Sequence, residues 1–126
     1  ARLGATVASV PAHFADCEVF ILAVVDAPEI EAVLFGENGL ATVLRAGHTV
    51  LLCPTVSPQD VQAFAERLSG LGVHVVDAPM SGGPVRARDA SMSLMLAGSP
   101  AVLLALDALL KALSSKRFVI SGQRLT

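Results

Sequence analysis

Residues 19–28 read Val-Phe-Ile-Leu-Ala-Val-Val-Asp-Ala-Pro, and this stretch decides the fold class. Seven apolar residues in a row, rich in Val and Ile, predict a strand that is covered on both faces, as in a parallel sheet. Asp26 then offers a side chain that can cap a helix, and Pro28 fits the first helical turn. A buried strand that leads directly into a helix is the beginning of a βαβ unit.

The same alternation of strand and helix continues along the chain. Ser57 offers a cap to a second helix, which has Pro58 in its first turn and one apolar stripe. A third helix is predicted over Pro100–Leu113, where only Asp107 and Lys111 mark a polar face, so we expect it to lie between two packed layers. Further strands are predicted at Thr49–Cys53, Val73–Ala78, Met92–Ala97 and Arg117–Ile120.

The order of these elements defines the fold class. Strands separated by helices predict an α/β protein with a Rossmann-like, doubly wound and mostly parallel sheet. The chain contains no Gly-X-Gly-X-X-Gly, the motif that sets a pyrophosphate against the first helix of such a domain. Residues 1–5 resemble the end of a helix, and residues 122–126 follow the last strand without a further element. We therefore expect the C-terminal portion of a Rossmann-like domain, without its first βαβ unit.

Composition and charge exclude several classes of protein. Hydrophobic residues make up 53% of the chain and charged residues 16%, which excludes a disordered protein. A net charge of −2 without a Lys/Arg cluster argues against nucleic acid, and the apolar runs are too short to span a membrane. Cys17 and Cys53 form no Cys-X-X-Cys and the three histidines do not cluster. We expect reduced thiols, no metal site and a cytoplasmic protein, with a mitochondrial one as the alternative.

The stretch Asp77-Ala78-Pro79-Met80-Ser81-Gly82-Gly83-Pro84 leaves the carboxyl end of a predicted strand. Open parallel sheets bind their ligands at this edge. Ser81 adds a hydroxyl donor, while Gly82 and Gly83 let backbone N–H groups approach a ligand without a Cβ in the way. Two interpretations stay open: an anion site suited to a carboxylate, and a tight turn, which is the more frequent meaning of a short glycine motif.

Two other loops follow predicted strands on the same edge. Thr55 can donate a hydrogen bond to a cofactor or substrate oxygen, or it can serve only as a turn or capping hydroxyl. Asp26 can bind a ribose hydroxyl, but the helix cap already explains it. We favour the cap for both Asp26 and Ser57.

Four motifs follow one another along the chain. They are Val-Leu-Phe-Gly-Glu-Asn-Gly-Leu at 33–40, Thr-Val-Ser-Pro at 55–58, Asp-Ala-Pro-Met-Ser-Gly-Gly at 77–83 and Ser-Met-Ser-Leu-Met-Leu-Ala-Gly at 91–98. In this order they resemble the β-hydroxyacid dehydrogenases, a family that includes 3-hydroxyisobutyrate dehydrogenase and L-threonate dehydrogenase. The resemblance covers nearly the whole chain, and several motifs in the same order are more specific than any one of them.

The resemblance implies an activity and assigns roles to residues. The reaction would be reversible hydride transfer between NAD or NADP and the hydroxyl-bearing carbon of a small 3-hydroxy acid. Ser81, Gly82 and Gly83 would hold the substrate carboxylate near the nicotinamide. Thr55 would contact the nicotinamide side of the cofactor.

Other features of the family map less completely onto this chain. Val24 and Val25 would line the adenosine side of the cofactor through backbone contacts, where many members have Leu-Pro. Ala90 stands in place of a customary Gly. The Gly-rich phosphate loop would precede Ala1, and the catalytic lysine would follow Thr126. No catalytic residue is therefore expected among the 126 residues.

Residues 1–126 are thus expected to form a partial NAD(P)-binding domain that is inactive by itself. The alternative is a non-catalytic α/β module used for self-association or for binding a partner. In the strand order that the resemblance implies, the apolar run Val19–Val25 would lie beside the first strand of the domain, so it would form an open sheet edge here, which proteins normally cover. We therefore expect a homo-oligomer, or association with missing segments of the same protein, and no nucleic-acid or membrane partner.

Overall fold

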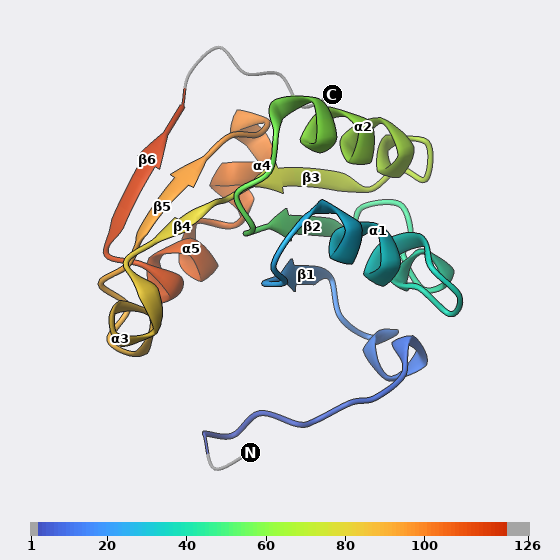
Figure 1. The fold of residues 1–126 in the computed structure, drawn as a ribbon, viewed down its shortest axis with the longest axis horizontal. Helices are drawn as coiled ribbons and strands as arrows, with labels where there is room; N and C mark the ends of the chain where they lie inside the picture. The colour runs from blue at the N-terminus through green and yellow to red at the C-terminus, as the bar shows by residue number, and fades with distance from the viewer. Residues whose placement is uncertain (1–2, 121–126) are drawn as a thin grey trace.

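A three-stranded parallel sheet carries the fold in the computed structural model, which describes residues 3–120 (Figure 1). Its strands are β1 (Val19–Leu22), β2 (Thr49–Leu52) and β3 (His74–Asp77), in the spatial order β1-β2-β3. Each lies within a predicted strand and is shorter than it. The parallel pairing confirms the fold class expected from the alternation of strands and helices.

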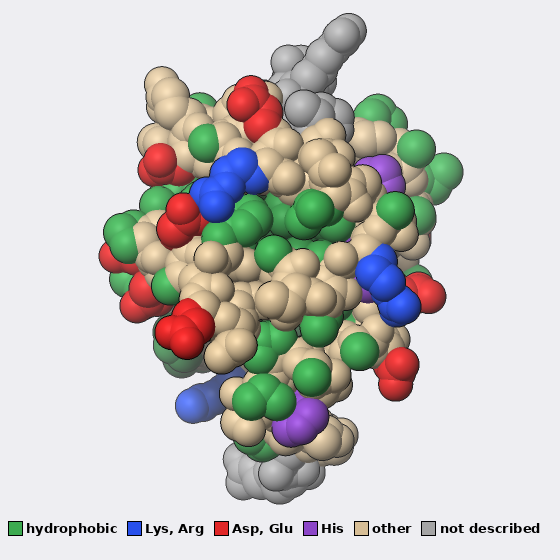
Figure 2. Space-filling view, turned by 90° about the vertical axis from the view of Figure 1, so that its right-hand side faces the viewer, with side chains coloured by type: hydrophobic (Ala, Val, Ile, Leu, Met, Phe, Trp, Pro, Cys, Tyr) green, Lys and Arg blue, Asp and Glu red, His purple; other side chains and the backbone are tan. Residues whose placement is uncertain are grey.

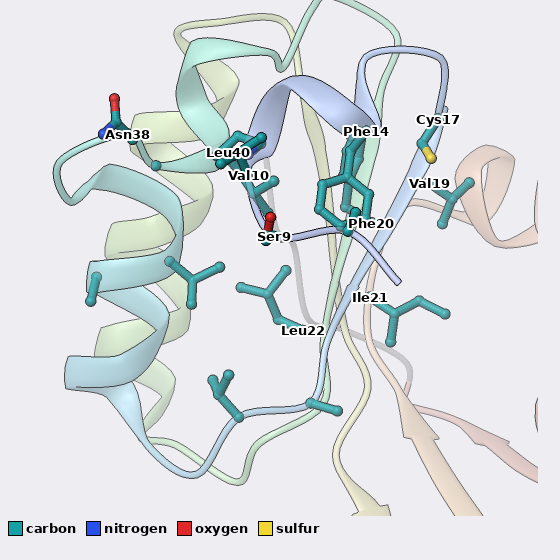
Figure 3. Close-up of a pocket in the computed structure, with 17 residues that line it drawn as sticks. Ser9, Val10, Phe14, Cys17, Val19, Phe20, Ile21, Leu22, Asn38 and Leu40 are labelled. Atoms are coloured by element: carbon teal, nitrogen blue, oxygen red, sulfur yellow. The ribbon is translucent and has the colours of Figure 1, made fainter. Parts of the chain in front are cut away.

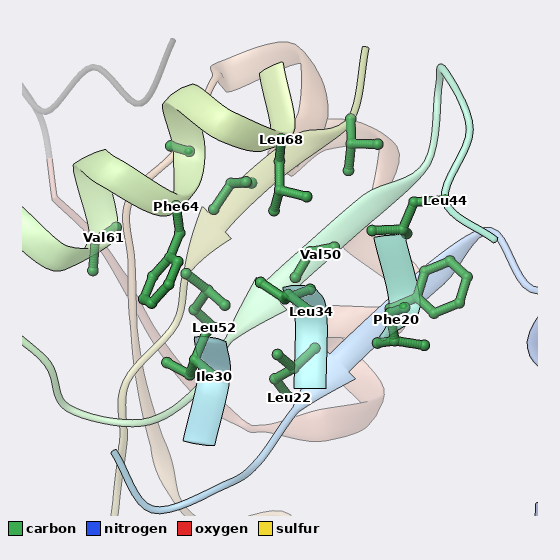
Figure 4. Close-up of a cluster of buried hydrophobic side chains, with 14 of the residues drawn as sticks. Phe20, Leu22, Ile30, Leu34, Leu44, Val50, Leu52, Val61, Phe64 and Leu68 are labelled. Carbon is green, nitrogen blue, oxygen red and sulfur yellow. The ribbon is translucent and has the colours of Figure 1, made fainter. Parts of the chain in front are cut away.

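Two helices cover one face of this sheet, α1 (Ala27–Phe35) and α2 (Pro58–Ser69). Side chains from both helices point toward β1 and β2 and form a buried hydrophobic cluster with them (Figure 4). The apolar stripe of α2 is buried as its spacing predicts. Members of this cluster include Phe20, Leu22, Ile30, Leu34, Val50, Leu52, Val61, Phe64 and Leu68.

Both helices begin at the caps that the sequence predicts. A carboxylate oxygen of Asp26 accepts a hydrogen bond from the amide of Glu29, and the hydroxyl of Ser57 accepts one from the amide of Asp60, each at 3.1 Å. Glu29 reaches back and accepts a hydrogen bond from the amide of Val25 at 2.8 Å. This reciprocal cap uses the Val25 amide that a longer β1 would need for the sheet.

Helices α4 (Pro100–Ala105) and α5 (Asp107–Leu113) cover the opposite face of the sheet. The prediction of one continuous helix here was wrong, because the chain changes direction at Leu106, where φ is −92° and ψ is 4°. Leu106 and Leu110 are both buried in a second hydrophobic cluster after this break. An almost uniformly apolar sequence gives no signal for such a break. The expectation that this segment lies between two packed layers was also wrong, because α4 has no buried residue and Leu104 is 77% exposed.

A second sheet extends the first one. It contains β4 (Met80–Ser81), β5 (Ser93–Leu96) and β6 (Lys116–Val119), with β4 antiparallel and β6 parallel to β5. Asp77 and Ala97 exchange two backbone hydrogen bonds of 2.9 Å, and these join the second sheet to the first.

Strands β5 and β6 run opposite to β1, β2, β3 and β4. The segment between β4 and β5 holds only the short helix α3 (Gly83–Arg88), whereas a parallel crossover needs a dozen or more residues. The chain therefore turns back beside itself, and β5 runs antiparallel to β3 and β4. Strand β6 is parallel to β5 and is therefore reversed as well, so the mostly parallel sheet that the sequence predicts has two reversed strands.

Strand β1 forms the open edge of the first sheet, as the family's strand order implies. Its apolar run is not covered on both faces, contrary to the expectation from the sequence. Within residues 3–120, β1 pairs only with β2, and Ile21 is 42% exposed. The chain before β1 is extended and enters a short 3-10 helix, η1 (Pro11–Phe14). A second 3-10 helix, η2 (Leu40–Thr42), precedes β2.

Two expectations concern the ends of the chain. Residues 122–126 lie outside the described residues, as do the first two residues of the predicted helix end. Gly4 has a φ of +90°, a value that suits a glycine at the end of a helix.

The longest helix in the described part of the chain, α2, has 12 residues, and no helix there is long and apolar enough to cross a membrane.

Candidate functional site

The loops that carry the predicted site residues leave one edge of the first sheet. The register aligns Leu22, Leu52 and Asp77 across β1, β2 and β3, so the three strands end in one row (Figure 1). The segments that follow contain Val24 and Val25, then Thr55, and then the Ser-Gly-Gly turn. Open parallel sheets bind ligands outside this edge.

The first two loops expose the residues that the resemblance assigns to cofactor binding. Val25 is 78% exposed and Val24 is half-buried. The amide of Val25 already donates to Glu29, so a backbone contact to a cofactor is left to its carbonyl oxygen. Thr55 is exposed, and the helix after it is capped by Ser57. The hydroxyl of Thr55 is therefore not needed to begin that helix.

Ser81, Gly82 and Gly83 form the turn from β4 into α3, so the turn interpretation of this motif is correct as a description of structure. Gly82 has a φ of +130° and Gly83 a φ of +72°, a region that residues with a Cβ rarely adopt. All three residues are exposed. Ser81 lies four residues beyond Asp77, or roughly 13 Å along an extended chain. The turn thus projects past the row in which β1 and β2 end.

Two titratable groups lie where β2 and β3 end. Burial raises the pKa of the half-buried Asp77 carboxyl to about 6. Burial also raises the pKa of the Cys53 thiol to about 11, and the negative charge of Asp77 adds to this shift. Cys53 therefore stays a neutral thiol near pH 7 and is not a nucleophile. Sequence reasoning did not single out Asp77; an acidic residue at the end of an apolar strand was the available signal.

An apolar hollow of about 620 Å³ lies along β1, on the side away from β2 (Figure 3). Phe14, Ile21 and Leu22 line it together with Val10 of the N-terminal segment. It includes Val24 but neither Thr55 nor the Ser-Gly-Gly turn, so the hollow and the predicted substrate residues are separate features.

On the face shown in Figure 2 the basic side chains are scattered, whereas most of the acidic ones lie along one side, the left in this view. Hydrophobic side chains are exposed in the middle of the face. Within residues 3–120 no group of His, Cys, Asp and Glu is arranged to hold a metal ion.

Residues 1–122 match the model of one protein family, the NAD binding domain of 6-phosphogluconate dehydrogenase. The chain belongs to this family. The family fold agrees with the parallel sheet, the helices on both of its faces and the loops at its carboxyl edge. The cofactor class of the family is NAD, in agreement with the prediction of NAD or NADP.

Relatives within this family are dehydrogenases and reductases of small hydroxy acids. The L-threonate dehydrogenase of Haemophilus influenzae is 37% identical over 86% of this chain and 36% of its own length. The 2-hydroxy-3-oxopropionate reductase of Escherichia coli is 33% identical over 83% of this chain and 36% of its own length. The chain therefore spans about a third of the length of these relatives.

A crystal structure of 3-hydroxyisobutyrate dehydrogenase from Salmonella typhimurium superposes with a TM-score of 0.82. It is 32% identical and is matched over 89% of this chain and 39% of its own. A protein solved in complex with NADP+, 20% identical, superposes with a TM-score of 0.87 and supports the fold alone. These relatives confirm the resemblance to the β-hydroxyacid dehydrogenases and do not favour the alternative of a non-catalytic module.

Proposed function

We propose that this chain is part of an NAD(P)-dependent dehydrogenase that acts on a small 3-hydroxy acid. Residues 1–126 would form part of one NAD(P)-binding domain. The observation that carries the proposal is the row of loops at the carboxyl edge of β1, β2 and β3, which holds two of the family motifs, those at 55–58 and 77–83. The named activities of the relatives supply the substrate class.

The residues at this edge fit part of a dinucleotide. Val24 and Val25 offer apolar surface and a free carbonyl oxygen to the adenosine side, and Thr55 offers an exposed hydroxyl to the nicotinamide side. The bound cofactor would supply the hydride acceptor. The chain's own residues bind and orient: the Ser81 hydroxyl and the backbone of Gly82 and Gly83 would hold the substrate carboxylate. We assign no catalytic acid or base to these 126 residues.

An activity panel tests this proposal. The protein that carries this chain is assayed with small 3-hydroxy acids and with NAD+ or NADP+, and nicotinamide reduction is followed by absorbance. Ser81→Ala should raise KM for the hydroxy acid about tenfold or more and leave KM for the cofactor unchanged, because a hydrogen bond to a charged group is lost. Ser69→Ala, at the exposed end of α2, is the control. Absence of reduction with every acid would refute the dehydrogenase proposal.

We further propose that a strand from outside this chain covers the open edge of β1 in a cytoplasmic protein. The strand would come from a second copy or from another segment of the same protein. The unpaired edge and the apolar hollow beside it support the idea, since exposed apolar edges favour pairing. Sedimentation of the 126-residue chain at micromolar concentration should show association, and a stable monomer would contradict it.

A further inference from the structure

Arg86, on α3, lies directly against the Ser-Gly-Gly turn. A Cβ placed on Gly82 would lie 2.7 Å from Cδ of Arg86, 3.0 Å from its Cβ and 3.3 Å from its Cγ. The aliphatic stem of Arg86 therefore packs along the Cα of Gly82, in space that any side chain at position 82 would fill. The guanidinium begins one bond beyond Cδ, so its charge is within reach of the turn.

No carboxylate of the described chain neutralises this charge. The ion pairs within residues 3–120 are Arg67–Glu31 and Lys111–Asp107. Asp89 is the acidic group whose pKa is affected by the charge of Arg86. Its carboxylate, however, accepts hydrogen bonds from the amide and the hydroxyl of Ser91. These hydrogen bonds are the largest causes of the lowered pKa of Asp89, and the charge of Arg86 is the smallest.

The turn beside Arg86 also has donors without an acceptor. No backbone carbonyl in the described part of the chain accepts a hydrogen bond from the amide of Gly82. The hydroxyl of Ser81, the preceding residue, is exposed. The carbonyl oxygen of Arg86 accepts hydrogen bonds from the amides of Ser91 and Met92, at 2.9 and 3.2 Å, and these hold its backbone in place.

An unpaired guanidinium, a free amide and an exposed hydroxyl on one turn complement a carboxylate, because Arg binds this group through two parallel hydrogen bonds. We propose that Arg86 is a specificity-determining residue, the cation that makes the Ser-Gly-Gly turn select an ionised carboxylate over a neutral group of the same shape. This inference rests on the proposed function, since it deepens the role given there to the turn. The substrates selected are hydroxy acids as anions, and the corresponding hydroxy amides are rejected.

Binding to the 126-residue chain tests the inference without requiring catalysis. The probes are 3-hydroxypropionate and its neutral analogue 3-hydroxypropionamide, and the readout is the NMR shift of the Gly82 and Gly83 amides on titration. The acid should shift both amides saturably and the amide analogue should not. Arg86→Gln should weaken binding of the acid about tenfold or more, and Arg86→Lys should restore part of it, because the stem and the charge are retained.

Arg88→Gln is the matched control. It removes the same charge from the same helix, but residues two apart on a helix face different directions. Its binding should match that of the parent chain. Equal binding of the acid by Arg86→Gln and the parent, equal binding of both probes, or no binding at all would each overturn the inference. Binding that depends on Arg86 in a protein that reduces no nicotinamide would uphold it and refute the dehydrogenase proposal instead.

Discussion

The two sheets differ in how much of each is covered. All four residues of β2, at the centre of the first sheet, are buried, because α1 and α2 lie on one face and α4 and α5 on the other. In the second sheet β5 alternates between buried and exposed residues, and β6 is largely exposed. The register places Met95 beside Phe118 on the uncovered face, where they are 39% and 53% exposed.

This difference separates the region that stabilises the fold from the region proposed to bind ligands. The first sheet buries side chains on both faces, and the helices on one of these faces, α1 and α2, begin at side-chain caps. The proposed carboxylate site lies where the second sheet begins, on the short elements β4 and α3, which have no buried residue. A well-packed sheet thus positions an exposed turn, a common division of roles between scaffold and binding loop. The following predictions test whether stability resides in the first sheet.

The largest effect is expected for a truncation in the core of the first sheet. Leu34→Ala removes a fully buried side chain of α1 and should lower the free energy of unfolding by about 2–5 kcal/mol, because transfer energy is lost and a cavity remains. Phe118→Ala removes a larger side chain from β6 that is half exposed, and it should cost less than about 1 kcal/mol. Urea unfolding of both variants measures the difference. Equal losses would show that the second sheet is as tightly packed as the first.

An intermediate effect is expected at Asp77, where the two sheets meet. Its pKa is raised from 3.8 to about 6 by burial, so the folded state holds this proton more tightly than the unfolded state. The stabilising contribution is complete below pH 3.8 and is lost as pH rises to about 6 and above. Asp77→Asn should therefore be more stable than the parent at pH 7, by about 1–2 kcal/mol after allowance for solvent access. Its free energy of unfolding should no longer fall as the pH rises through this range.

Cys53→Ala is the control for the Asp77 prediction. Burial, and not the thiol, causes the shift at Asp77, so this variant should retain the dependence on pH whatever its own stability. Unfolding free energies measured between pH 4 and 7 give the comparison. An unchanged slope in Asp77→Asn would mean that another group titrates in this range.

The sequence predicted the first sheet more completely than the second. Apolar runs followed by Asp26-Ala-Pro and Ser57-Pro carry local signals for a strand, a cap and a helix, and all are present. The reversed direction of β5 carries no such signal, since it depends on the length of the connection through α3 rather than on the residues of the strand. The break between α4 and α5 at Leu106 likewise depends on how the helices pack in the folded chain, and not on a local sequence signal.

The candidate site divides in the same way. The Ser-Gly-Gly turn and Thr55 could be found because their residue types are typical of ligand-binding loops at a sheet edge. Arg86 could not, because its approach to Gly82 depends on where α3 places the side chain. The raised pKa of Asp77 depends on neighbours that surround it only in the folded chain.

The smallest effect compares the starts of two helices, one on each face of the first sheet. Ser57 accepts a hydrogen bond from the amide of Asp60 at the start of α2, whereas Ser99, which precedes α4, makes no side-chain cap. Ser57→Ala should therefore lower the free energy of unfolding by about 1 kcal/mol, because an amide at the helix start loses its partner. Ser99→Ala makes the same chemical change and should have almost no effect. Denaturant unfolding of the pair isolates the hydrogen bond from the loss of a hydroxyl. If the two variants lose the same stability, the cap at Ser57 contributes nothing to the free energy of unfolding. Helix α2 must then be held on the first sheet by packing alone.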